Sequence, residues 1–125
     1  MKTNNRNTGD KGEDFAIDFF KKEGFEILDR NYSKPWGEID IVAKKNKVIY
    51  FIEVKTVFIG EMGDLENFDP LFNIDKNKKN RLRKVIQTYL KDKKEDDSDY
   101  QVDAVAVYLK SDKSYEIERV EDIFL

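Results

Sequence analysis

The segment at residues 37–55 constrains the fold of this chain more than any other stretch. Its first half alternates apolar and polar residues, and its second half contains an unbroken apolar run at residues 48–52 that is rich in β-branched and aromatic side chains. Both patterns are typical of β-strands. A polar stretch separates them, so we expect a buried hairpin, which a two-residue loop at Asn46 and Lys47 would close.

Three charged residues of this hairpin are not explained by packing: Asp40, Glu53 and Lys55. Because strand side chains alternate between faces, Glu53 and Lys55 project from the same face. With a two-residue loop, Asp40 lies opposite Glu53, and directly opposed β-carbons are roughly 4.5–5.5 Å apart. Two carboxylates at that separation repel each other unless a cation lies between them, which is a geometry suited to a hard divalent ion. The alternative is an exposed hairpin end with solvated charges.

The composition predicts a single domain over residues 1–125 and limits its chemistry. The chain is 39% hydrophobic and 39% charged, without cysteine or histidine. Disulfides, thiolate nucleophiles, structural zinc and the commonest general base are therefore excluded, and catalysis would depend on carboxylates, lysines, hydroxyl groups and a metal that prefers oxygen. No apolar run approaches the roughly 20 residues of a membrane span, and the first residues lack the core of a signal peptide. We expect a cytoplasmic protein without a membrane partner.

The apolar patterns of the remaining chain predict an α/β fold, a mixed β-sheet flanked by α-helices. Asp103 interrupts an otherwise apolar strand, and we expect it to be a structural hydrogen-bonding carboxylate. Besides the hairpin, we expect helices at residues 10–23 and 76–93, strands at residues 25–29, 100–109 and 115–118, and loops at residues 31–36, 56–75 and 93–99.

Charged residues of the two helices are candidates for the same site. Glu13 lies at the edge of the apolar stripe of the first helix, where it either completes a metal site or interacts with the helix dipole. Lys78 continues the apolar stripe of the second helix, so it either reaches water or points to an anion. The net charge of −3 argues mildly against a polyanionic partner, but residues 76–84, which include Arg81, hold several basic residues and no acid. Phosphate binding and a merely solvated face both remain open for this segment.

These residues support a hypothesis of metal-assisted phosphodiester hydrolysis. If Asp40 and Glu53 hold Mg²⁺ or Mn²⁺, helped by the backbone carbonyl of Val54, the ion can polarise a phosphoryl oxygen and lower the pKa of a bound water. Lys55 would then orient that water or neutralise charge that develops on the phosphorane oxygens.

The sequence resembles the small bacterial proteins of the YraN, or UPF0102, family over nearly its whole length. That family is assigned to the restriction-endonuclease-like, PD-(D/E)xK fold, close to archaeal Holliday-junction resolvases. The resemblance implies that Asp40 and Glu53 are metal ligands, Lys55 the catalytic lysine, Glu13 an accessory acid and Lys78 a phosphate contact. The motifs that carry it are Gly12-Glu13, Asn31-Tyr32, Gly37-Glu38-Ile39-Asp40, Phe51-Ile52-Glu53-Val54-Lys55, Lys78, Arg81-Leu82, Tyr89-Leu90 and Asp103-x-Val105-Ala106-Val107.

Taken with the resemblance, the sequence predicts a Mg²⁺- or Mn²⁺-dependent endonuclease that acts on DNA, including branched or structured DNA. Ser33 and Val57 stand where the family often has arginine, so two phosphate-binding charges are missing. One alternative is a noncatalytic nucleic-acid-binding or adaptor module that retains the fold, and another is a protein-binding role for residues 56–75. Resolvases are usually dimers because a junction has two-fold symmetry, which leaves a homodimer open.

Overall fold

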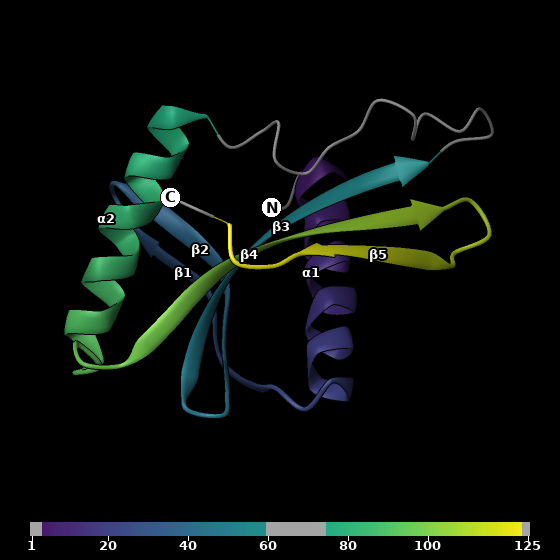
Figure 1. Cartoon of the computed structure of the whole chain (residues 1–125). Coiled ribbons are helices and arrows are strands. Elements are labelled where there is room, and N and C mark those ends of the chain that lie inside the picture. Colours follow the sequence, from purple (N-terminus) through teal and green to yellow (C-terminus); the bar gives the residue numbers. More distant parts are fainter. Residues whose placement is uncertain (1–3, 60–74, 124–125) are drawn as a thin grey trace.

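A mixed β-sheet lies between two helices (Figure 1). The structure, a computed structural model, describes residues 4–59 and 75–123. The strand order is β1-β2-β3-β4-β5, with β3 and β4 parallel and the other neighbours antiparallel. This is the predicted α/β fold, and it is consistent with the restriction-endonuclease-like arrangement. In chain order the elements are α1 Asn4–Lys22, β1 Glu26–Lys34, β2 Gly37–Lys45, β3 Val48–Ile59, α2 Lys76–Asp92, β4 Asp99–Lys110 and β5 Tyr115–Val120.

The two helices cover opposite faces of the sheet, and each forms its own hydrophobic core. On one face Ala16 and Phe20 of α1 pack with sheet residues such as Ile52. On the other face the apolar stripe of α2 packs with residues such as Val42 and Phe51. The central strands are therefore buried on both sides, which explains their nearly continuous apolar sequences.

The central hairpin has the register that the sequence predicts. β2 and β3 pair antiparallel from the loop as far as Ile41 and Ile52. Asn46 and Lys47 form the loop with φ angles of 52° and 67°. Two-residue loops need this left-handed conformation because its twist matches that of the paired strands.

Several predicted boundaries are wrong, and for β1 and β3 the reason is pairing with another strand. β1 continues to Lys34 through the expected loop at residues 31–36, since its pairing with β2 reaches that residue and Pro35 lies just beyond. β3 continues to Ile59 because β4 pairs with it along the whole of that length. The helix α1 begins at Asn4 instead of residue 10. The rest of the expected connection, residues 60–74, lies outside the described residues.

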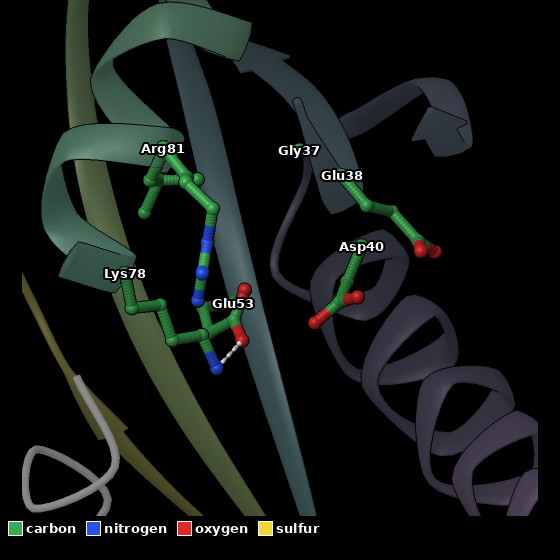
Figure 2. Close-up of a pocket in the computed structure, with 7 residues that line it drawn as sticks. Gly37, Glu38, Asp40, Glu53, Lys78 and Arg81 are labelled. Atoms are coloured by element: carbon green, nitrogen blue, oxygen red, sulfur yellow. Dashed lines mark ion pairs between the residues drawn. The ribbon is translucent and has the colours of Figure 1, made fainter. Parts of the chain in front are cut away.

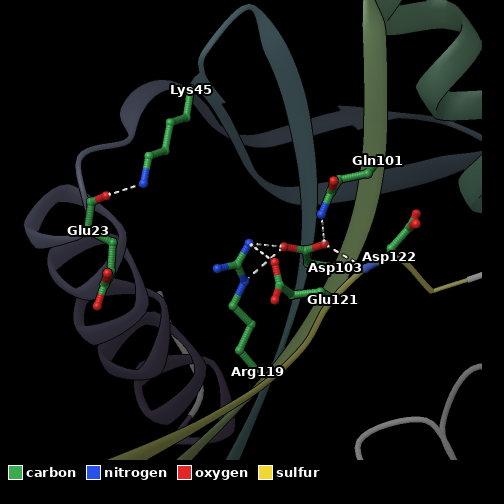
Figure 3. A network of polar contacts seen from close by, with 7 residues as sticks. All are labelled: Glu23, Lys45, Gln101, Asp103, Arg119, Glu121 and Asp122. Atoms are coloured by element: carbon green, nitrogen blue, oxygen red, sulfur yellow. Dashed lines mark hydrogen bonds and ion pairs between the residues drawn. The ribbon is translucent and has the colours of Figure 1, made fainter.

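A polar network around the buried Asp103 joins β4 to β5 (Figure 3). Arg119 donates two hydrogen bonds to Asp103 Oδ2, from Nε at 2.9 Å and from Nη2 at 2.7 Å. The side chain of Gln101 and the backbone N–H of Asp122 donate to Oδ1, each at 2.9 Å. These contacts confirm the predicted structural role of Asp103, because a buried carboxylate is tolerated only when it is paired and hydrogen-bonded. Among residues 4–59 and 75–123, no helix is long and apolar enough to cross a membrane.

Candidate functional site

A cavity of about 240 Å³ opens beside the end of the β2–β3 pairing, under the first turns of α2 (Figure 2). Asp40 contributes to it from β2, Glu53 from β3, and Lys78 and Arg81 from α2. The cavity thus combines two acids and two bases that the sequence singles out. Among the residues that the structure describes, its lining is Gly37, Glu38, Asp40, Glu53, Lys78, Arg81 and Leu82.

Asp40 lies where β2 changes the face to which its side chains point. Ile41 belongs to the core under α1, whereas Ile39 belongs to the core under α2. Asn31, across from Asp40 in the β1–β2 register, has a φ of 54°, so the neighbouring strand is irregular at the same level. Because of this change, the Asp40 carboxylate reaches toward β3, where its Oδ2 accepts a hydrogen bond of 2.7 Å from the Val54 N–H.

The observed register of the hairpin is the one in which Asp40 would lie opposite Glu53. The pairing of β2 with β3 ends at Ile41 and Ile52, one step before the two acids would pair. Both side chains nevertheless line the same cavity.

The environment of Asp40 disfavours the ionised form of its carboxyl group. Burial is the main cause that raises the pKa of Asp40, from the ordinary value of 3.8 to about 8, and the charge of Glu53 is the next. Glu13 and Glu38 act in the same direction, whereas the hydrogen bond from Val54 acts against them. A cation beside these carboxylates would stabilise the ionised form of Asp40.

The ammonium group of Lys78 forms an ion pair with Glu53, not with Asp40. Its Nζ lies 2.5 Å from Glu53 Oε1, and the two side chains are 34% and 15% exposed. The backbone holds Lys78 in place, since its N–H donates a 2.8 Å hydrogen bond to Oδ1 of the helix-capping residue Asp75.

A Cβ atom at Gly37 would lie only 3.1 Å from the Arg81 carbonyl oxygen, so this glycine allows β2 to begin directly against α2.

Two other residues singled out from the sequence do not line the cavity. Glu13 Oε1 accepts a 3.2 Å hydrogen bond from Arg30 Nε, and the Glu13 side chain is only 13% exposed. Glu13 is still close enough for its charge to raise the pKa of Asp40. Lys55 is exposed on β3, two residues beyond Glu53. The structure therefore brings Glu13 near the acidic pair but leaves Lys55 outside the lining of the cavity.

Comparison with known proteins connects this geometry to a family. Residues 12–107 match Uncharacterised protein family UPF0102. The chain belongs to this family. A UPF0102 protein of Dictyoglomus thermophilum is 38% identical over 97% of this chain and 99% of its own length. A UPF0102 protein of Helicobacter hepaticus is 40% identical over 98% of each chain, and one of Campylobacter lari is 39% identical over 80% of this chain and 82% of its own.

Asp40 and Glu53 are the residues of this UPF0102 protein that could hold Mg²⁺ or Mn²⁺. Mg²⁺ commonly uses one or two carboxylates and retains several water molecules, and Asp40 and Glu53 provide the carboxylates. The N–H and C=O groups of a strand residue point to the same side, so the Val54 carbonyl faces the opening that its N–H faces. No group of three or more acidic side chains in the described part of the chain is arranged around a metal position. In such a site the carbonyl oxygen and water would supply further ligands.

Sequence reasoning missed Glu38, although this residue lines the cavity and its charge raises the pKa of Asp40. The signal was present, because Glu38 is the first of the two acids in the Gly-Glu-Ile-Asp motif and precedes Asp40 by two residues. Strand alternation places residues at this spacing on one face when the strand is regular.

Proposed function

We propose that this UPF0102 protein is a Mg²⁺- or Mn²⁺-dependent endonuclease that hydrolyses phosphodiester bonds in DNA, including branched or structured DNA. The observation that carries the proposal is the cavity in which Asp40 and Glu53 lie beside Lys78 and Arg81. Carboxylates suit a hard metal ion, and lysine and arginine suit the phosphate group on which that ion would act.

Each residue has a role in this proposal. Asp40, Glu53 and the Val54 carbonyl would hold the ion, which when bound polarises a phosphoryl oxygen and lowers the pKa of water. Lys78 and Arg81 would bind the nonbridging phosphate oxygens. Lys55 would neutralise negative charge that develops during the reaction, and this role requires its exposed side chain to turn toward the bound DNA. Glu13 would act as an accessory acid through its charge beside Asp40.

The proposal is tested by cleavage of branched and linear DNA with Mg²⁺ or Mn²⁺. We expect activity that a chelator abolishes and that Glu53→Ala and Lys55→Ala reduce by at least about a hundredfold, the cost of losing one well-placed charged group. Glu121→Ala, an exposed acid distant from the cavity in sequence, is the control and should retain full activity. Equal cleavage by the wild type and both variants would identify a contaminating nuclease and overturn the proposal.

A noncatalytic nucleic-acid-binding module is the second candidate. The Lys78–Glu53 ion pair favours it, because this contact already neutralises one of the two acids. This candidate predicts DNA binding that survives chelation, depends less on salt when Lys78 and Arg81 are replaced, and is accompanied by no cleavage.

A further inference from the structure

An exposed tryptophan lies beside the cavity, on the outer surface of α2. Trp36, in the turn between β1 and β2, is 43% exposed. It lines a depression of about 390 Å³, together with Arg83, Lys84, Gln87 and Thr88 of α2. The next residue, Gly37, lines the cavity that contains Asp40 and Glu53. Two consecutive residues therefore line the depression and the cavity.

The position of Trp36 is fixed by its two neighbours in the chain. A Cβ atom at Gly37 would lie 3.1 Å from the Arg81 carbonyl oxygen and 3.5 Å from Val85 Cβ, so the chain contacts α2 directly there. On the other side, the ring of Pro35 restricts the backbone. An aromatic side chain on such a rigid turn loses little conformational freedom when it stacks against a ligand.

The cations beside Trp36 have no carboxylate partner in the part of the chain that the structure describes. Arg30 and Arg119 form ion pairs with acids, whereas neither Arg83 nor Lys84 forms one among those residues. Arg83 donates a 2.5 Å hydrogen bond to the neutral side chain of Asn80, so no carboxylate among the described residues compensates its charge. The surface of α2 is therefore positive although the net charge of the chain is −3.

We infer that the Trp36 surface binds single-stranded DNA by stacking an unpaired base on the indole ring. Arg83 and Lys84 contact the phosphates on either side of that base. Exposed aromatic rings combined with basic side chains bind single strands in this way without reading sequence, whereas the base faces of a duplex are hidden in its stack. Because Trp36 adjoins the cavity, a base held there places the neighbouring backbone beside Asp40 and Glu53. Binding of single-stranded DNA at Trp36 does not depend on the proposed function. The inference rests on that function in one respect, which is that the unpaired segment belongs to the DNA that is cleaved.

The fluorescence of Trp36 tests the inference, because this is the single tryptophan of the chain. Oligothymidylate about ten nucleotides long, within known site sizes, is titrated into the full-length protein with a chelator present. We expect saturable quenching by the single strand and much weaker quenching by a duplex of the same length. Absence of quenching, or equal quenching by the duplex, would overturn the inference.

Substitutions at Trp36 separate stacking from simple proximity. Anisotropy of labelled oligothymidylate should show that Trp36→Phe retains most of the affinity and that Trp36→Leu loses at least about fivefold. Phe58→Ala removes another exposed aromatic, on β3, and serves as the control that leaves affinity unchanged. Equal affinities of the Phe and Leu variants would exclude stacking.

The charge contribution is measured as a salt dependence. Replacing Arg83 and Lys84 by alanine should reduce the slope of log affinity against log salt by about 1.4, or about 0.7 for each phosphate contact. Replacing Lys47 and Lys113, exposed lysines in two hairpin turns, changes the net charge equally and should leave the slope unchanged. Equal slopes for the two double variants would contradict the assigned contacts.

Glu53→Ala distinguishes this inference from the proposed function. The variant should bind oligothymidylate at least as tightly as the wild type while it loses cleavage. If the wild type binds the single strand through Trp36 but cleaves no DNA, the endonuclease proposal fails and the binding surface stands. If it cleaves DNA without a response at Trp36, the opposite conclusion follows.

Discussion

The Lys78 ammonium group lies 2.5 Å from the Glu53 carboxylate, so the helix above the cavity supplies a counter-ion to one of its two central acids. This position gives Lys78 two alternative partners. In the structure it neutralises Glu53. If Glu53 holds a metal ion as we propose, Lys78 would be released from Glu53 and would be free to contact a phosphate. Metal binding and DNA binding should therefore strengthen each other, since coupling between two sites is reciprocal.

Replacing Lys78 by methionine should tighten Mn²⁺ binding severalfold, up to about tenfold, because Glu53 loses a competing cation. The same variant should bind DNA more weakly, since a phosphate contact is lost. Calorimetric titration with Mn²⁺ and anisotropy with labelled DNA measure the two effects. Lys76→Met removes an equal charge from an exposed position on α2 and should leave Mn²⁺ affinity unchanged. Equal Mn²⁺ affinities of the wild type and Lys78→Met would show that the ion pair does not compete.

Asp40→Asn should stabilise the metal-free protein at pH 8 by more than about 1 kcal/mol, which corresponds to about 3–6 °C in melting temperature. Burial and the charge of Glu53 raise the pKa of Asp40 from 3.8 to about 8. The folded protein therefore binds this proton more tightly than the unfolded chain, and the resulting stabilisation is present below pH 4 and lost as the pH rises to 8. Asparagine carries no charge at either pH.

Thermal denaturation with a chelator, between pH 4 and pH 8, measures this difference. The advantage of Asp40→Asn over the wild type should shrink steadily as the pH falls and vanish near pH 4. Asp97→Asn, which removes a charge from an exposed position, should give no such trend. Mg²⁺ or Mn²⁺ should raise the melting temperature of the wild type at pH 8 and have much less effect on Asp40→Asn. A constant difference across the pH range would show that the charge of Asp40 costs nothing.

Local sequence patterns predict the hairpin but not the full lengths of its neighbours. The loop at Asn46 and Lys47 follows from a polar stretch between two apolar runs, because the determinants lie within a few residues. The extension of β3 to Ile59 depends on its pairing with β4, which begins at Asp99. Such pairing is decided by tertiary contacts, and intrinsic preferences of a strand segment do not reveal it.

The candidate site shows the same division between local and distant determinants. Strand alternation and the apolar stripe of α2 single out Glu53 and Lys78 as candidates, but their contact depends on how α2 packs on the sheet. The change of face at Asp40 also involves Asn31 on another strand, so alternation within β2 does not predict it. The contact between Glu13 and Arg30 likewise joins α1 to β1 across 17 positions of the chain.

Asp103→Ala should lower the free energy of unfolding by about 3–5 kcal/mol, because it leaves Arg119 without its buried partner. Glu121→Ala also removes a contact with Arg119, at 3.2 Å, but the Glu121 side chain is 64% exposed. We therefore expect it to cost less than about 1 kcal/mol. Urea denaturation measures both values. Similar costs for the two variants would show that burial of Asp103 contributes little. Metal affinity of the Asp103 variant, measured below its unfolding transition, should remain that of the wild type.

Gly12→Ala should destabilise the protein by about 1–3 kcal/mol, because α1 packs against β3 at this residue without room for a side chain. An added Cβ would lie 1.9 Å from Thr56 Oγ1 and 2.9 Å from Thr56 Cβ. Rotation of the threonine relieves the first contact but not the second, so the helix must shift. Glu13 then moves away from Asp40.

The second substitution, Thr56→Ala, isolates this packing effect. It removes the hydroxyl and methyl groups of Thr56 but retains its Cβ, so the double variant should recover part of the lost stability. We expect a coupling energy of at least about 0.5 kcal/mol in a double-mutant cycle followed by urea denaturation. Strictly additive effects would mean that α1 accommodates the methyl group without touching Thr56. The close approach that positions Glu13 would then not be the source of the destabilisation.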